Sequence, residues 1–210
     1  MLLKLFKQLL NNKMFHVPAA ERNKEPILKV LQKYIPQGFK GRALEIASGA
    51  GVHVAHFAQF YPNITWQPTE YDQRNLGSIS AYTAHTGVKN VHPPLHVDIT
   101  TPPEDLKIDT ISPGNVDIIN NINMIHISPW DTAIGLFRTA KYFCGLLDIY
   151  SCTDHLPYKA QLLLKAMCNS QWGLRDIDDV KKLAEENGFK LLEMIDMPAN
   201  NKTVIFQKNS

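Results

Sequence analysis

Short apolar runs alternate along this chain with longer stretches whose apolar residues recur at helical spacing. The two patterns meet most clearly between residues 41 and 60. An apolar run over 42–47 predicts a buried strand, residues 48–51 read Ser-Gly-Ala-Gly, and a helix is then predicted by apolar residues at i, i+3, i+4 and i+7, namely Val54, Phe57, Ala58 and Tyr61. A strand, a glycine turn and a helix in this order place backbone N–H groups and a helix N-terminus beside a ligand.

The same alternation continues to the end of the chain. Strands are predicted over 64–70, 95–99, 116–124 and 145–151, with helices between most of them. Two closing strands, 190–197 and 203–207, are joined by Pro-Ala-Asn-Asn, which is a hairpin signature. We therefore expect an α/β protein with a mostly parallel seven-strand sheet that ends in an antiparallel hairpin.

Composition narrows the function classes. The chain has 210 residues, enough for one domain with a sizeable core, and its net charge of +2 does not suggest a nucleic-acid partner. Three cysteines without a signal peptide argue for a reducing compartment, and we expect an intracellular, cytoplasmic protein. No apolar run approaches the ~20 residues that cross a bilayer.

The N-terminal part divides near residue 18. Residues 1–18 carry lysines but no acid, and we expect a helical or disordered extension rather than a targeting presequence, because Arg and Ser are absent. The domain is expected over 19–210. A helix is predicted to start at Pro26. The loop before it carries Glu21, Arg22 and Asn23, which form either a solvated turn or a lid on the acceptor side of a site.

Carboxylates follow the predicted strands. Glu45 precedes Gly49 by four residues, and Glu70 lies 19 residues past Gly51, at the spacing where nucleotide-binding α/β folds place the acid that binds ribose hydroxyls. Asp72 competes for this role, although it is better placed as the N-cap of the next helix. Asp98 ends the third strand, where a contact with a bound ligand and a role as a loop cap explain it equally well.

Polar side chains also end the fourth strand. Asn121, Asn123 and His126 follow its apolar run. Buried asparagines are costly without partners, so we expect them to face a ligand or a loop backbone. They are our candidates for catalysis.

The end of the first strand and its glycine turn, from Glu45 to Gly51, resemble motif I of class I S-adenosylmethionine-dependent methyltransferases, E/D-x-G-x-G-x-G, with Ala47 in place of the first glycine. Six segments, AERNKEPIL, LEIASGAGVHVAHFA, WQPTEYDQR, INMIHISP, WGLRD and DMPANNK, extend this to a resemblance over residues 19–207 to the methyltransferase-like protein twenty-six family. The resemblance implies a Rossmann-like class I fold, S-adenosyl-L-methionine as cofactor and an unidentified methyl acceptor. It implies cofactor contacts at Glu45, Ala47, Ser48, Gly49, Gly51, Glu70, Asp98, Asn121 and Ile122, with Asp98 accepting from the adenine amino group.

Residues 141–171 depart from that family. A glycine-rich fifth strand and an Asn-Gly loop are expected there, but the chain reads CGLLDIYSCTDHLPYKAQLLLKAMCNSQ from Cys144. We expect an atypical fifth strand. An interaction protein that binds cofactor without turnover is therefore the alternative to an active methyltransferase.

Two other functions are disfavoured. A dinucleotide-dependent oxidoreductase needs a third glycine where Val54 stands. His53 and His56 share a helix turn, but they lack an acidic or cysteine partner at ligand spacing, so we expect no metal site. The Asn/Asp-Pro-Pro-aromatic motif of base methylation does not follow the fourth strand, which favours a small-molecule or protein acceptor.

Overall fold

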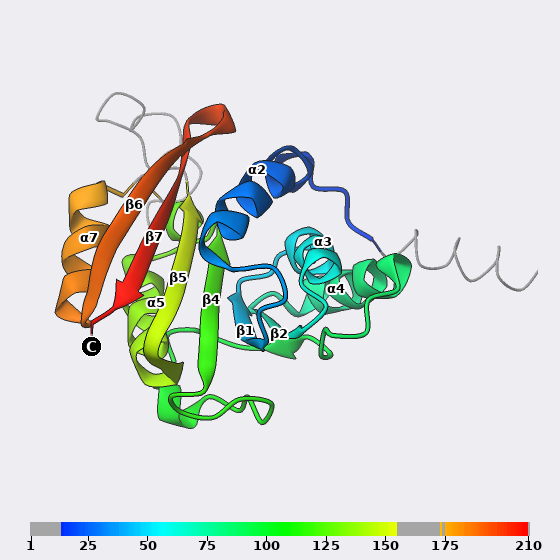
Figure 1. Ribbon diagram of the computed structural model, residues 1–210, viewed down its shortest axis with the longest axis horizontal. Helices are drawn as coiled ribbons and strands as arrows, with labels where there is room; N and C mark the ends of the chain where they lie inside the picture. The colour runs from blue at the N-terminus through cyan, green and yellow to red at the C-terminus, as the bar shows by residue number, and fades with distance from the viewer. Residues whose placement is uncertain (1–13, 155–172, 174, 210) are drawn as a thin grey trace, which may run out of the picture. The chain divides into compact units, whose positions relative to one another are not determined.

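The structure, a computed structural model, describes residues 14–154, 173 and 175–209 (Figure 1). The chain folds into two compact units, one through Asp98 and one from Ile99. Each unit is described by itself below. In the described part of the chain, no helix has both the length and the apolar character to cross a membrane.

The first unit is a three-stranded parallel sheet with its helices. Its elements are α2 (Pro18–Tyr34), β1 (Gly41–Ile46), α3 (Val52–Phe60), β2 (Ile64–Glu70), α4 (Gln73–Thr86) and β3 (Leu95–His96). Strand β2 pairs in parallel with both β1 and β3. Helices α3 and α4 pack against each other (Figure 1). Side chains of β1 are buried from Ala43 to Ile46, which explains its continuous apolar run.

Two predictions for this unit were wrong in their boundaries. The third strand pairs over two residues rather than 95–99, and Trp66 makes a separate bridge to Val91. Helix α2 starts at Pro18, so Pro26 lies inside the helix and residues 21–23 are helical instead of a loop. An internal proline removes one backbone hydrogen bond. Burial of the apolar face outweighs that loss, since this face is almost wholly inaccessible at Ile27, Leu28, Val30 and Leu31.

Residues before α2 pack on α4. The backbone N–H of Phe15 donates to Ser78 Oγ at 2.9 Å, and Tyr82 Oη donates to the carbonyl of Phe15 at 3.1 Å. Ser78 Oγ in turn donates to the carbonyl of Ala50 at 2.9 Å. The end of the expected extension is therefore hydrogen-bonded to the unit, whereas residues 1–13 lie outside the described part.

The second unit contains two parallel strands and a hairpin. Its strands are β4 (Val116–Ile122), β5 (Cys144–Asp154), β6 (Phe189–Met197) and β7 (Asn201–Lys208). Its helices are η1 (Pro103–Asp105), η2 (Ile125–Ile127), α5 (Trp130–Phe143), α7 (Ile177–Glu186) and η3 (Pro198–Asn200). Strands β4 and β5 are parallel, β7 runs antiparallel to β5, and β6 runs antiparallel to β7. The predicted hairpin is thus confirmed.

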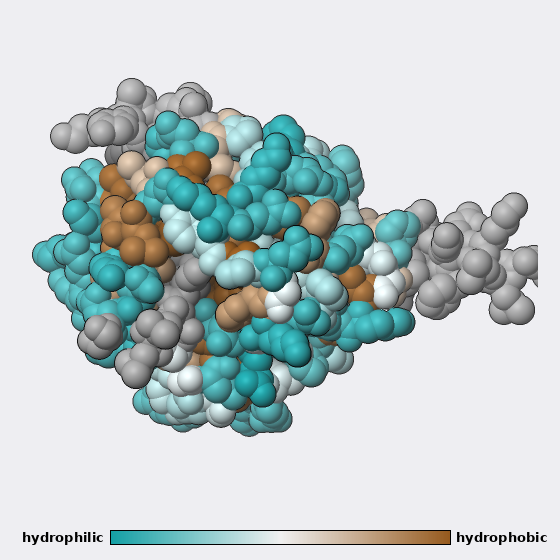
Figure 2. Space-filling model, in the orientation of Figure 1, coloured by the Kyte–Doolittle hydropathy of each residue, from teal (hydrophilic) through white to brown (hydrophobic). Residues whose placement is uncertain are grey.

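Aromatic packing holds α5 on this sheet. Phe137 of α5 meets the rings of Phe189 and Phe206 edge-on, at centroid distances of 6.2 and 5.5 Å. Helices α5 and α7 pack side by side (Figure 1). Strand β6 also exposes Leu192 and Met194, and Figure 2 shows hydrophobic residues gathering over this strand.

The fifth strand is irregular, as expected. Val116 pairs with Cys144 but Ile118 pairs with Ile149, so four residues of β5 lie opposite Asp117 alone. Its length, Cys144–Asp154, exceeds the predicted 145–151. Apolar residues at helical spacing predict a helix over 158–169, which lies outside the described residues. Together the units contain five parallel strands and an antiparallel hairpin, which confirms the predicted α/β class.

Candidate functional site

The turn after β1 is built from left-handed backbone. Ala47, Gly49 and Gly51 have φ values of 57°, 56° and 94°. The N–H of Gly51 closes the turn on the carbonyl of Ser48 at 3.0 Å, and the N–H of Ser48 donates to the carbonyl of Thr69 at 2.9 Å. Left-handed backbone is unfavourable for a residue with a Cβ, so Ala47 is strained where the methyltransferase motif has glycine.

The two glycines of the turn face different surroundings. A Cβ added at Gly49 would meet no atom within 4 Å, so the turn has open space on that side. A Cβ added at Gly51 would lie 2.6 Å from Cα of Ile79 in α4. Gly49 therefore leaves room beside the backbone for a ligand, whereas Gly51 allows α3 and α4 to pack closely.

Glu70 joins the end of β2 to this turn. Its carboxylate is 8% exposed and accepts from the backbone N–H of Gly49 at 2.7 Å and of Asp72 at 2.9 Å. A carboxylate has about four lone-pair positions, so it can accept further hydrogen bonds from hydroxyl groups. The carboxylate predicted from spacing therefore lies directly beside the glycine turn.

Asp72 is occupied elsewhere. Its carboxylate caps α4 by accepting from the N–H of Arg74 at 3.0 Å, and it also accepts from the Arg74 guanidinium. Hydrogen bonds from Arg74 lower the pKa of Asp72 to about 2. The predicted N-cap is confirmed, and Glu70 is the better-placed acid of the two.

The two other carboxylates predicted for the site, Glu45 and Asp98, lie at the same edge of the sheet of the first unit. Glu45 is buried near the end of β1, and its carbonyl accepts from Thr69 Oγ1 at 2.9 Å. Asp98 is half-buried and follows Val97, whose N–H donates to the carbonyl of Glu70 at 3.0 Å. The carboxyl ends of parallel strands form the usual ligand-binding edge of an α/β sheet. This edge brings together the predicted residues from Glu45 to Gly51, Glu70 and Asp98.

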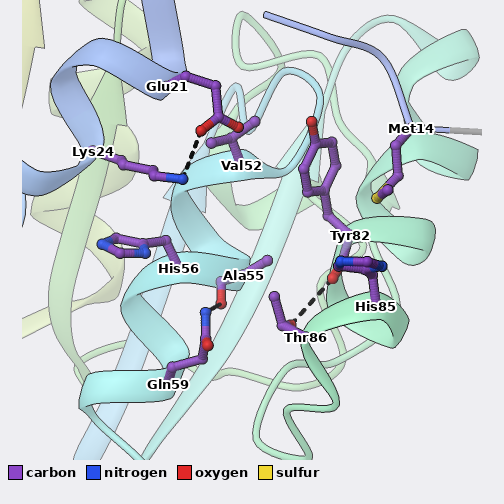
Figure 3. A pocket seen from close by; sticks show the side chains of 10 residues that line it. All are labelled: Met14, Glu21, Lys24, Val52, Ala55, His56, Gln59, Tyr82, His85 and Thr86. Carbon is purple, nitrogen blue, oxygen red and sulfur yellow. Dashed lines mark hydrogen bonds and ion pairs between the residues drawn. The ribbon is translucent and has the colours of Figure 1, made fainter. Parts of the chain in front are cut away.

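The three candidates of α2 point in different directions. Glu21 pairs with Lys24 at 2.6 Å, and both line a cavity of about 330 Å³ between α2, α3 and α4 (Figure 3). Arg22 is exposed. Asn23 is 2% exposed, and its Oδ1 lies 2.8 Å from Nε2 of His53 in α3. Residues two apart on a helix lie about 200° apart, so the set cannot act as one cluster.

His53 and His56 serve helix packing. Burial, followed by the charges of His56 and Lys24, lowers the pKa of His53 to about 3, so His53 is neutral. His56 Nε2 lies 3.2 Å from Glu25 of α2. Among the residues that the structure describes, no three His, Cys, Asp or Glu side chains are grouped to hold a metal ion.

In the second unit, the catalytic candidates occupy the exit of β4. Asn121 and Ile122 are buried at the end of the strand, Asn123 is left-handed with φ 59°, and His126 is buried in η2. Asparagine tolerates left-handed backbone better than most residues. The shape of the exit therefore favours a residue such as Asn123 at this position.

Two details of the second unit were not anticipated. Ser128 followed by Pro129 predicts a helix with Ser128 as N-cap, but helix α5 begins at Trp130 with Pro129 as N-cap, so this prediction was wrong. Ser128 Oγ instead donates to the carbonyl of Met124 at 2.8 Å. Arg175, 47 residues along the chain, donates to the carbonyl of Ser128 at 3.0 Å and lies over the ring of Trp130. No local pattern could have shown this contact, because it joins distant segments.

Comparison with known proteins agrees with this arrangement. Residues 13–208 match a family described as "Protein of unknown function (DUF938)". A SAM-dependent methyltransferase from Aquifex aeolicus is 13% identical and has a TM-score of 0.68, over 96% of this chain and 97% of that chain.

Other solved structures show the same fold. An O-methyltransferase family protein from Burkholderia thailandensis is 12% identical with a TM-score of 0.70, and this chain covers 57% of its length. A mitomycin 7-O-methyltransferase is 14% identical with a TM-score of 0.69, over 89% of this chain and 54% of that chain. These similarities show the class I methyltransferase fold, and the predicted fold class is confirmed.

Proposed function

The chain belongs to the DUF938 family, and on this premise we propose that it is an S-adenosylmethionine-dependent methyltransferase acting on a small-molecule or protein acceptor. The observation that carries the proposal is the placement of Glu70. Its buried carboxylate lies 2.7 Å from the N–H of Gly49, beside a turn with open space at that glycine.

The residues at the sheet edge fit the cofactor chemically. Glu70 would accept from the ribose hydroxyls, since a carboxylate can accept from two hydroxyl groups at once. Gly49 would let the backbone approach the cofactor closely. Asp98 would accept from the adenine amino group. Glu45, Ala47, Ser48, Gly51, Asn121 and Ile122 would complete the contacts.

Orientation would be the main contribution of the protein to catalysis. The bound cofactor supplies an electrophilic methyl group on a sulfonium. The side chains of Asn121, Asn123 and His126 would orient an acceptor for in-line attack, and such orientation supplies ~7–11 kcal/mol of barrier lowering. His126 would take a proton only from an acceptor that must lose one.

The irregular fifth strand supports a second candidate function. Because β5 accommodates four residues opposite Asp117, the segment after α5 departs from regular parallel pairing. If the residues of this segment that face the acceptor are misplaced, the protein would no longer orient an acceptor, but the cofactor contacts of the first unit would remain. The alternative is therefore an intracellular interaction protein that binds cofactor but transfers methyl groups weakly or not at all.

Binding should be measured first. Isothermal titration of the full chain with S-adenosylmethionine, S-adenosylhomocysteine and NAD should show binding of the first two. If NAD binds and neither adenosyl compound does, the methyltransferase proposal is wrong. Glu70→Ala should weaken binding about ten- to hundredfold, the effect of losing a charge-assisted hydrogen bond.

Turnover should then be compared between two chains. The first is the natural chain, and the second carries a glycine-rich strand and Asn-Gly loop in place of residues 141–171. Methyl transfer is followed as release of S-adenosylhomocysteine, with metabolite or protein extracts as acceptors. Transfer by the second chain alone supports the inactive alternative, whereas acceptor-dependent turnover by the natural chain contradicts it.

Asn123 needs a substitution that spares its backbone. Asn123→Gly removes the side chain at a φ of 59°, which glycine adopts without strain. Asn123→Ala adds backbone strain to the same loss. A role in orienting the acceptor predicts equal loss of turnover in both variants, with lower stability in the alanine variant alone.

A further inference from the structure

Within the described part of the chain, Asn23 has a buried side-chain amide whose oxygen is hydrogen-bonded and whose nitrogen is not. The residue is 2% exposed on α2, and its Oδ1 lies 2.8 Å from Nε2 of His53. Its Nδ2 has no hydrogen-bond partner among the described residues. A buried donor without a partner destabilises a protein, so a residue retained in this state calls for another explanation.

His53 fixes the orientation of this amide. The Asn23 oxygen is an acceptor, so Nε2 of His53 carries the proton and donates. His53 is neutral, since burial lowers its pKa to about 3, and this donor persists across the physiological pH range. With its oxygen held in this way, Asn23 presents two N–H bonds in a fixed direction.

The pair lies next to the glycine turn. His53 is the second residue of α3, two positions after Gly51, and α2 packs on α3 at this point. A second contact, between Glu25 and Nε2 of His56 at 3.2 Å, holds α2 on α3 about one helical turn further along. The N-terminus of α3 also carries the positive end of the helix dipole, which favours anions.

We infer that Asn23 binds the carboxylate of the amino-acid portion of the adenosyl cofactor, with His53 as the residue that positions it. This inference rests on the proposed function. The nitrogen is covered in this structure, so the contact requires the atoms over it to move aside while His53 keeps the Asn23 oxygen in place. A neutral amide provides directional donors for an anion without burying a cation.

A pair of ligands isolates this contact. S-adenosylhomocysteine carries the amino-acid carboxylate, whereas 5′-methylthioadenosine has the same adenosine and thioether but lacks the carboxylate. Isothermal titration of the full chain with both ligands should show that Asn23→Leu weakens S-adenosylhomocysteine binding about ten- to hundredfold. Binding of 5′-methylthioadenosine should stay unchanged. Asn23→Asp should weaken the first ligand further, because two carboxylates then repel each other.

Asn90 provides a matched control. Its Nδ2 lies within hydrogen-bond distance of the carbonyls of Ala58, Tyr61 and Ile64 at 2.9–3.2 Å, so its amide nitrogen, unlike that of Asn23, has partners in the same unit. Asn90→Leu should lower the melting temperature and leave the ratio of the two affinities unchanged. Asn23→Leu should change that ratio; it removes one unpaired buried donor but also leaves Nε2–H of His53 without its acceptor, so the affinity ratio and not the melting temperature is the readout.

The outcomes separate this inference from the proposed function. Normal S-adenosylhomocysteine binding by Asn23→Leu, or equal weakening of both ligands, overturns the role of Asn23 and leaves the methyltransferase proposal intact. Failure of the natural chain to bind S-adenosylhomocysteine overturns both. His53→Ala should reproduce a smaller, carboxylate-dependent loss, since Asn23 then keeps its donors but loses their fixed direction.

Discussion

The carboxylate of Glu70 accepts a hydrogen bond from the backbone N–H of Gly49 at 2.7 Å. This contact joins the end of β2 to the turn after β1, so the acid proposed to bind ribose also fixes the shape of the glycine turn. Its second oxygen holds the N–H of Asp72 at the start of α4. Glu70 therefore contributes to structure and to ligand binding, and experiments must measure both.

Glu70→Ala should lose stability and cofactor affinity together. It leaves two backbone N–H groups without their acceptor, at a cost of about 1–3 kcal/mol. Asp72→Ala removes a helix cap but should leave affinity for S-adenosylhomocysteine unchanged. Thermal denaturation and titration of both variants provide the measurement, and normal binding by Glu70→Ala alongside loss in Asp72→Ala would show that the acids are wrongly assigned.

Alanine substitutions at the two glycines should separate ligand space from helix packing. Gly49→Ala places a methyl group in open space, so we expect a modest loss of stability from its φ of 56° and a large loss of affinity. Gly51→Ala places a methyl group 2.6 Å from Cα of Ile79, so we expect severe destabilisation. Melting temperature and affinity are measured for each. Equal melting temperatures would contradict the structural difference.

Ala47→Gly should stabilise the protein. The substitution relieves left-handed backbone at a φ of 57°, and we expect a gain of about 1 kcal/mol in the free energy of unfolding. Ala43→Gly in the same strand is the control, since Ala43 is fully buried in regular strand and the change there should destabilise. Denaturant unfolding of both variants decides the matter, and a loss of stability in Ala47→Gly would remove the argument from strain.

Acid should destabilise the first unit through His53. The unfolded chain protonates His53 near pH 6.5, whereas the folded chain resists protonation down to about 3. Stability is therefore fully present above about pH 6.5 and falls below it, by up to about 1.4 kcal/mol for each pH unit, until the pH reaches the folded pKa.

The test compares unfolding free energies between pH 7 and pH 4. His53→Gln should flatten this dependence, because glutamine binds no proton in either state. His92→Gln serves as the control for loss of a histidine elsewhere in the first unit. If the slopes of the natural chain and His53→Gln are equal, buried neutral His53 does not determine the acid response.

The sequence predicted the parts of the fold that depend on local pattern. The alternation of apolar runs and helical spacing located β1, β2, α4 and the hairpin, since burial of continuous faces dictates those patterns. Spacing placed Glu70 at the end of the second strand, and the N-cap preference of aspartate placed Asp72 at the start of α4. These inferences need no knowledge of which segments meet.

Contacts between distant segments could not be predicted. Pro26 suggested a helix start, but the buried face of α2 extends the helix back to Pro18. Residues 21–23 appeared as one polar cluster, although helical geometry sends Glu21 to a cavity and Asn23 to His53. The residue that a Cβ at Gly51 would clash with, Ile79, lies 28 residues further along the chain. The sequence could therefore not show that Gly51 serves helix packing whereas Gly49 leaves space for a ligand.

The hydroxyl of Ser78 connects the residues before α2 to the glycine turn. It accepts from the amide of Phe15 and donates to the carbonyl of Ala50, and Ser78 itself is almost fully buried. One hydroxyl group serves both bonds, with its hydrogen toward Ala50 and an oxygen lone pair toward Phe15, so displacement of the turn disturbs its contact with Phe15. Deuterium exchange at the Phe15 amide should therefore slow when a bound ligand holds the glycine turn. The Phe15 amide would then report ligand binding at a turn some 35 positions further along the chain.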